Sequence, residues 1–294
     1  MRKITHLILI AIFACVNFAA FGQSNQDWWN SLTPAWKKVF QKEVMKGQDV
    51  QPTSEQLDVM VGLERIDCSK NTEINSLEPL GFLKRLKILN CSYCTGVGSL
   101  KGLGALINLK ELDCSNNNSL NSLLPIATLN NLEKLDCHNT MIVSLGPLRG
   151  LGQLKVLRCD ETTVRDLEPL KSLIKLESLN LSNNIGVYDL AYLKDLSNLT
   201  ELYASNTKIE ALEPIEKLLN IEVLEIANTP IRSLMSCLYL KNLKELDCSN
   251  TEIKKLSYMY NHKFLKIVTI SGTQIPKAEV MEFKKLKTDV ILVE

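Results

Sequence analysis

The sequence has almost no net charge and very little histidine. Its 34 Lys and Arg residues nearly balance 33 Asp and Glu residues, which leaves a formal charge of +1, and it contains three histidines. A chain without a basic block has no electrostatic attraction to nucleic acid or to an anionic membrane surface. We therefore expect neither nucleic acid nor a membrane surface as its partner.

Long apolar runs are also lacking, with one exception at the start of the chain. Residues 4–21 are almost entirely apolar and follow Arg2 and Lys3. This pattern is typical of a secretory signal peptide, so we expect residues 1–22 to be cleaved and the mature protein, with no integral membrane segment, to be exported to the periplasm, cell surface or medium. The alternatives are a retained anchor, since about 18 apolar residues can just span a bilayer, and a lipoprotein signal ending at Cys15. We favour cleavage because the apolar run continues past that cysteine.

Motifs for metal and phosphate binding are missing as well. Cys91 and Cys94 have the C-x₂-C spacing, but no second pair and no histidine pair accompanies them, as a zinc site requires. The glycines at 96, 98, 102 and 104 do not form a phosphate-binding loop. We expect no metal and no cofactor.

The dominant feature of the sequence is an internal repeat of 22 or 23 residues, present in ten copies. Each copy reads L-x-x-L-x-(C/L/A/I)-x-x-(N/T/C), as in residues 109–117. The third core position is occupied in turn by Cys68, Cys91, Cys114, Cys137, Cys159, Leu181, Ala204, Ile226, Cys248 and Ile270. The alternation of apolar residues predicts one short strand per repeat with one buried face. A single strand cannot bury that face alone, so the copies must stack.

In the second half of each repeat, the chain is predicted to run back along the outer side of the stacked strands. Segments of the form L-x-P-(L/I) begin at Leu77, Leu145, Leu167 and Leu212. Proline is well tolerated at the first position of a short helical turn, so we predict 3₁₀ or short α turns there. The longer repeats carry Asn or Cys at the turn after the core, and the shorter ones carry Thr. These buried Asn and Thr side chains are expected to bond backbone groups that would otherwise be unpaired.

On these motifs, residues 63–275 resemble the leucine-rich-repeat family. The 22-residue form is similar to that of bacterial internalins and of protein-phosphatase regulatory subunits. The resemblance implies an α/β right-handed solenoid with a parallel concave sheet and a convex side of 3₁₀ or short helices. It also implies a non-catalytic module that binds a protein partner on its concave face. The alternatives are a regulatory or scaffold subunit of a separate enzyme, and a glycan-binding surface protein.

Both ends of the repeats look capped, as solenoids require. The N-terminal cap, residues 23–62, is predicted to hold helices that begin near Pro34 and Thr53. The C-terminal cap, residues 276–294, is predicted to hold a helix and then a strand. The residues expected to face inward on that helix are Val280, Phe283 and Leu286. Because both ends are capped, we expect a monomer.

Eight cysteines follow the expected signal peptide, and in exported proteins cysteines normally pair. Six of them occupy equivalent core positions, so that neighbouring ones stack in register on adjacent parallel strands. Side chains that point in the same direction resist the torsion of about 90° that a disulfide needs. We therefore predict a ladder of buried free thiols.

The outward positions of the strands form the candidate partner-binding surface. We select repeats three to five, where charges of both signs mix, and one tyrosine two repeats further on. The candidate residues are Glu111, Asp113, Lys134, Asp136, His138, Arg158, Asp160 and Tyr203. Stacked acids repel, so Asp113 beside Asp136 is unfavourable unless Lys134 and Arg158 compensate. The alternative is a solvated polar face that binds nothing.

Two chemical uses of this face are less well supported. A calcium site would draw on Asp67, Asp113 and Asp136, but flat strands rarely converge six oxygen ligands. A catalytic triad would combine His138 with Ser115 and an oxyanion hole, and regular strands use their backbone donors in the sheet. We therefore do not expect an enzyme.

Overall fold

The computed structural model describes residues 24–294, which divide into two compact units, one ending at Gly62 and the other spanning Leu63–Glu294. The expected signal peptide, residues 1–22, lies outside the described residues. Within residues 24–294, no helix is both long enough and apolar enough to cross a bilayer.

The first unit consists of the helices α2 (Asn25–Ser31), α3 (Pro34–Met45) and α4 (Ser54–Val61). Helix α3 begins as predicted, and so does α4, whose cap Thr53 exchanges hydrogen bonds with Gln56 in a capping box. Such reciprocal bonds satisfy backbone donors that the first helical turn leaves free. Helix α2, which the sequence analysis did not predict, begins with a second capping box.

Aromatic rings form the centre of this unit. The ring of Phe40 lies 4.9 Å from Trp28 in an edge-to-face arrangement and 5.8 Å from Trp36 in a stacked one. Trp29 donates from Nε1 to Gln51 Oε1 at 3.1 Å. Aromatic pairs in these geometries add stability beyond the area they bury, so three short helices suffice for a packed core.

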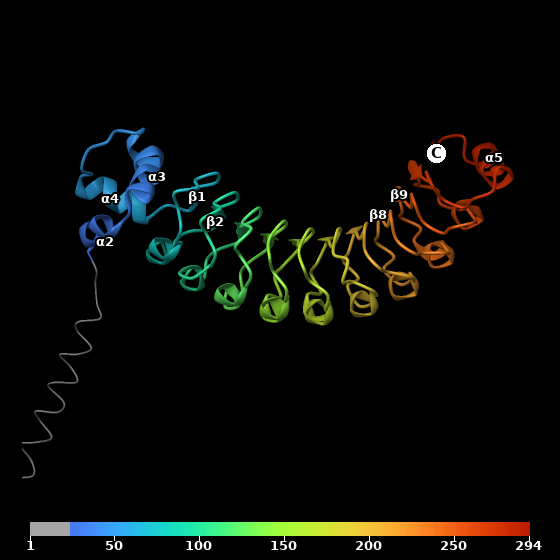
Figure 1. Ribbon diagram of the computed structural model, residues 1–294, viewed down its shortest axis with the longest axis horizontal. Helices are drawn as coiled ribbons and strands as arrows, with labels where there is room; N and C mark the ends of the chain where they lie inside the picture. Colours follow the sequence, from blue (N-terminus) through green and yellow to red (C-terminus); the bar gives the residue numbers. More distant parts are fainter. Residues whose placement is uncertain (1–23) are drawn as a thin grey trace, which may run out of the picture. The chain divides into compact units, whose positions relative to one another are not determined.

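The second unit contains one parallel sheet of eleven strands in chain order, shown in Figure 1 along the inner side of the curve of the repeats. The strands are β1 (Arg65–Asp67), β2 (Ile88–Asn90), β3 (Glu111–Asp113), β4 (Lys134–Asp136), β5 (Val156–Arg158), β6 (Ser178–Asn180), β7 (Glu201–Tyr203), β8 (Val223–Glu225), β9 (Glu245–Asp247), β10 (Ile267–Thr269) and β11 (Ile291–Val293). The first ten belong to the ten predicted repeats. The expected α/β solenoid is confirmed.

The return segments lie on the outer side, where the structure has 3₁₀ helices (Figure 1). They are η1 (Glu78–Phe82), η2 (Leu103–Ala105), η3 (Leu124–Ile126), η4 (Gly146–Gly150), η5 (Glu168–Ser172), η6 (Ala191–Leu193), η7 (Glu213–Ile215), η8 (Met235–Tyr239) and η9 (Ser257–Met259). Proline occupies the first or second position of five of them, and four of these were predicted; the fifth is η3. Between the two sides, the repeated leucines are almost completely buried, and stacking supplies the burial that no single repeat can achieve.

Most turns after a strand contain a buried Asn or Thr side chain that bonds backbone carbonyls, as expected. Asn117 Nδ2 donates to the carbonyls of Cys91 at 2.9 Å and Cys114 at 3.0 Å. In the shorter repeats a hydroxyl makes one such bond, for example Thr140 Oγ1 to the Cys137 carbonyl at 2.7 Å. In the longer turns at Asn117 and Asn184 an amide thus donates two hydrogens, whereas the shorter turns use a hydroxyl as a single donor.

The six cysteines at the core position form the expected ladder of free thiols. Each Sγ donates to a carbonyl of the following strand at 3.3–3.4 Å, and the acceptors are Asn90, Asp113, Asp136, Arg158, Asn180 and Thr269. All eight cysteines of residues 24–294 are buried and free. Burial raises the pKa of the Cys114 and Cys137 thiols well above the usual value. At these two positions the reactive thiolate is therefore suppressed.

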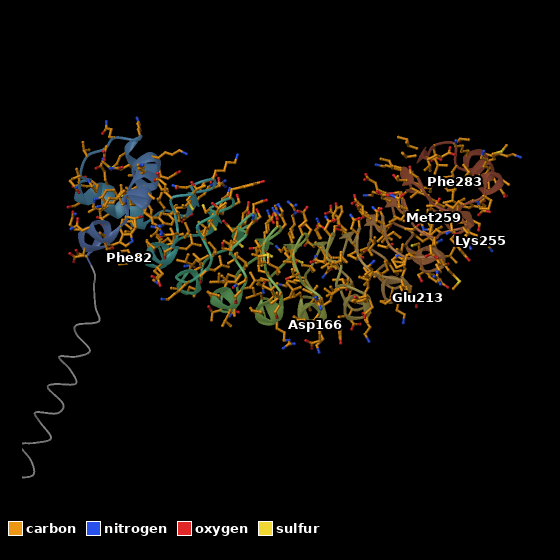
Figure 2. The ribbon with its side chains drawn as sticks, viewed as in Figure 1. Phe82, Asp166, Glu213, Lys255, Met259 and Phe283 are labelled. Atoms are coloured by element: carbon orange, nitrogen blue, oxygen red, sulfur yellow. The ribbon has the colours of Figure 1, made fainter. Side chains whose placement is uncertain are left out.

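At the C-terminal end, helix α5 (Lys277–Leu286) precedes β11, which pairs with β10. Phe283 and Val280 are buried as predicted, but Leu286 is 54% exposed, so its inward placement was wrong. The helix ends there, and the next residue turns inward instead: Lys287 Nζ donates to the carbonyl of His262 at 2.6 Å. Labels for Met259 and Phe283 mark this end in Figure 2.

A left-handed residue closes each strand turn and offers a way to raise stability. Six of these ten turns use Asn, one uses Gly272, and the remaining three use Lys70, Tyr93 and Glu161. Asn tolerates positive φ better than other side chains. We expect Glu161→Asn to raise the free energy of unfolding by about 0.5–1 kcal/mol, measured by urea titration. The reverse exchange, Asn206→Glu at an exposed turn, should lower the free energy of unfolding by a similar amount. Equal stability of the wild type and both variants would show that asparagine is not preferred at these turns.

Candidate binding face

The outward side chains of β3, β4 and β5 form a network of ion pairs on the concave face. The strands pair in register, so that Asp113, Asp136 and Arg158 are consecutive neighbours. Arg158 compensates the stacked acids as expected, with its guanidinium 3.1 Å from Asp136 Oδ2. Lys134 instead pairs with Glu111 at 3.2 Å. Both cations keep about half of their side-chain surface exposed, so both remain available to a partner.

A shallow depression of about 300 Å³ lies over these strands. Its polar lining comprises Arg65, Asn90, Glu111, Asp113, Lys134, Asp136 and Arg158. Ile88 and Val156 add half-buried apolar surface between the charges. Five of the eight predicted residues therefore meet in one place.

Asp113 also has a structural task that the sequence analysis missed. Its Oδ1 accepts from the backbone N of Ser115 at 3.0 Å and from the Ser115 hydroxyl at 2.6 Å. Asp247 and Ser249 repeat both bonds at 2.9 and 2.7 Å. Such local bonds hold the chain as it leaves the strand. The Asp-x-Ser spacing, visible in the sequence, was the signal for this role.

His138 lies beside the network and orients it. Its Nδ1 is 2.7 Å from Asp136 Oδ1, and its Nε2 is 3.0 Å from the amide nitrogen of Asn116. Asn116 Oδ1 in turn accepts from Asn139 at 2.9 Å. Because the amide nitrogen of Asn116 donates to Nε2, we assign the ring proton of the neutral histidine to Nδ1, facing Asp136. The imidazole therefore holds Asp136 in place for Arg158.

Asp160 is not an exposed contact residue, so that part of the prediction was wrong. It is 6% exposed, and Ser92, Ser115, Ser205 and Ala227 of the same column are also buried. The strands are three residues long, so this column lies in the turn that follows, where its residues are buried or half-buried. Burial raises the pKa of Asp160, while Arg158, 3.6 Å away, opposes that rise.

Tyr203 lies on β7, two strands beyond β5, and does not line the depression. Burial and the nearby charges of Glu201 and Glu225 raise its pKa. The structure therefore places Tyr203 in a different, acidic part of the concave face.

Residues 24–294 contain no group of three or more His, Cys, Asp or Glu side chains that could hold a metal ion. Asp67, Asp113 and Asp136 lie on β1, β3 and β4 and are not gathered into a calcium site.

Comparisons with known proteins identify the fold. An internalin, InlF, from Listeria monocytogenes has a TM-score of 0.66 at 19% identity, with 88% of each chain covered. The functional domain of InlJ from Listeria monocytogenes, which includes a cysteine ladder, has a TM-score of 0.70 at 19% identity, with 92% of this chain and 61% of that chain covered. The fold is the internalin-like leucine-rich repeat.

The same fold also matches a receptor with a bound ligand. The plant peptide hormone receptor RGFR1, in complex with RGF2, has a TM-score of 0.57 at 18% identity, with 66% of this chain and 33% of that chain covered. No family model matches the sequence, and no curated protein matches it.

The acidic part of the leucine-rich-repeat sheet makes stability depend on pH. Burial, together with Asp247 and Glu245, raises the pKa of Glu225. A carboxyl whose pKa is raised on folding favours the folded state at low pH, and this contribution is lost as pH rises through the folded-state pKa. We expect Glu225→Gln to raise the free energy of unfolding at pH 7 by a few tenths to about 1 kcal/mol, and to have little effect at pH 3.5. Urea titrations at both pH values test this, with exposed Glu210→Gln as the control; an equal gain at both pH values would exclude a charge effect.

Proposed function

We propose that this protein binds a protein partner through its concave sheet, with the contact centred on β3–β5. The observation that carries the proposal is the depression in which Lys134 and Arg158 stand beside Ile88 and Val156. Interface centres commonly combine arginine with desolvated apolar surface and pairs of opposite charge. The complex of RGFR1 with RGF2 supports the proposal, because it shows a ligand bound by a protein with a similar fold.

The ion pairs favour binding because they fix long side chains before the partner arrives. Arg158 is held by Asp136 at 3.1 Å, and Lys134 is held by Glu111 at 3.2 Å. A side chain that is already ordered loses less conformational entropy when it binds. Asp160 is a positioning residue in this scheme, since it is buried and lies against the guanidinium of Arg158.

Export of the mature protein is part of the proposal. Cleavage after Gly22 would make Gln23 the first residue, and mass spectrometry of the mature protein tests this directly. We also propose that the mature protein acts as a monomer, which its sedimentation over a range of concentrations tests.

The binding test fills the depression without removing any ion pair. A double variant, Ile88→Arg and Val156→Arg, places two bulky charged side chains over β2 and β5. The matched control makes the same exchange at Ile107 and Ile174, which are exposed and lie outside the strands. Each protein is immobilised and used to capture binding partners from an extract of the cells that produce it and from their culture medium.

We expect the wild type and the control to capture the same protein, and the concave variant to bind it at least ten-fold more weakly. Urea unfolding must show that both variants are folded. Equal capture by the concave variant would move the contact away from β3–β5. Capture of a glycan instead of a protein would replace the proposed partner class.

A further inference from the structure

A pocket of about 320 Å³ lies away from the concave sheet, where repeats five and six enter η5 and η6. Its lining includes Arg165, Asp166, Gly186, Tyr188, Asp189 and Tyr192. Figure 2 shows Asp166 on the outer side of the repeats, away from the strands. We propose that this pocket is a second binding site, for a neutral mono- or disaccharide. It is independent of the proposed protein contact.

The two tyrosines expose large aromatic surfaces at one place. Tyr188 is 64% exposed and Tyr192 is 42% exposed. Residue 188 is the only aromatic residue at its position in the repeats; the equivalent residues are Asn75, Gly98, Asn121, Val143, Arg165, Glu210, Arg232 and Lys254. Tyr192 stands where five other repeats have proline, although repeat nine also has a tyrosine there, Tyr258. Repeat six is thus the one repeat with an aromatic residue at both positions, and both rings line the same pocket.

The two aspartates depart from the pattern in the same way. Five other repeats have serine at this position, namely Ser76, Ser99, Ser122, Ser144 and Ser233, and each hydroxyl accepts the backbone N of the residue two positions on. Asp166 and Asp189 make this bond with Oδ1, at 2.8 and 2.9 Å. Serine would serve the fold equally well. The second oxygen of each carboxylate is therefore an added acceptor at the pocket.

Arg165 supplies the donors. Its side chain lies across Gly186, where a Cβ would overlap Arg165 Cγ, so the absence of a side chain at residue 186 makes room for it. No ion pair within residues 24–294 includes Arg165. Its planar donors are therefore not taken up by a carboxylate of the protein.

This combination suits a sugar better than an ion. Each sugar hydroxyl both donates and accepts, so it can bond a carboxylate and a guanidinium together. The apolar C–H face of the ring can pack on a tyrosine. Two carboxylates repel a phosphate, and Arg165 repels a simple cation. The volume is at the lower end of ligand pockets, which fits one or two sugar rings.

The test reverts the pocket to the chain's own repeat pattern. One variant carries Asp166→Ser and Asp189→Ser, and a second carries Tyr188→Asn and Tyr192→Pro. Because other repeats carry these residues at the same positions, both variants should fold, which urea unfolding checks. The probes are glucose, galactose, mannose, N-acetylglucosamine, maltose and cellobiose. Their binding is measured by saturation-transfer NMR and by changes in the ¹⁵N chemical shifts of the full mature chain.

We expect at least one sugar to bind the wild type with a dissociation constant of about 1 mM, as is usual for so small a ligand. Each revertant should bind at least ten-fold more weakly, while the concave variant Ile88→Arg with Val156→Arg should bind as the wild type does. Binding of no sugar in the panel would overturn the proposal, as would equal binding by the revertants. Tighter binding of inorganic phosphate or of arginine amide than of every sugar would also overturn it.

Discussion

Replacing Gly102 with alanine should lower the free energy of unfolding by about 3–5 kcal/mol. Gly102 has a φ of +98°, which residues with a side chain rarely adopt. A Cβ there would lie 2.6 Å from Glu78 Cα and 2.9 Å from the Leu77 carbonyl oxygen, both of which are backbone atoms of the preceding repeat. Because backbone cannot move aside as a flexible side chain can, two return segments would have to separate. Urea unfolding of the purified protein measures the loss.

Gly152→Ala is the matched control for this prediction. No atom lies within 4 Å of the Cβ that would be added at Gly152. Its replacement should change the free energy of unfolding by less than about 0.5 kcal/mol. A small effect at both glycines would mean that the return segments of neighbouring repeats do not pack as closely as the structure shows.

Replacing Asn117 with alanine should lower the free energy of unfolding by about 2–4 kcal/mol. The side chain is completely buried, and its amide donates to the carbonyls of Cys91 and Cys114. Without the amide, two buried carbonyls lose a partner where water cannot replace it. The desolvation cost of such groups is larger than the net value of an ordinary hydrogen bond. Urea unfolding again gives the measurement.

Two further variants separate this cause from general disturbance of the turn. Asn118→Ala changes the exposed neighbour and should have little effect. Asn117→Thr introduces the residue of the shorter repeats, whose hydroxyl bonds one carbonyl, as Thr140 does at 2.7 Å. It should therefore lose less stability than Asn117→Ala. Equal losses for the threonine and alanine variants would show that the hydrogen bonds are not the cause.

The repeat spacing was enough to predict the sheet, its register and the free thiols. Because the repeats stack, equivalent residues of successive copies occupy equivalent positions. The places of Cys114 and Cys137 in the sequence therefore already define their positions on neighbouring strands. For the same reason Asp136 and Arg158 could be placed side by side before the structure was known. A helix without a repeat, such as α2, had no such support and was not predicted.

Only the tertiary structure decided which candidate side chains are exposed. Asp160 shares a column with His138, yet it is buried whereas His138 is half-buried. Leu286 continues the helical pattern of Phe283, yet the chain turns and Lys287 takes the inward position. The depression on the sheet and the pocket at Tyr188 likewise depend on how side chains of different repeats lie against one another. The period of a sequence determines which backbone positions are equivalent, whereas exposure and side-chain partners depend on the neighbouring repeats in three dimensions.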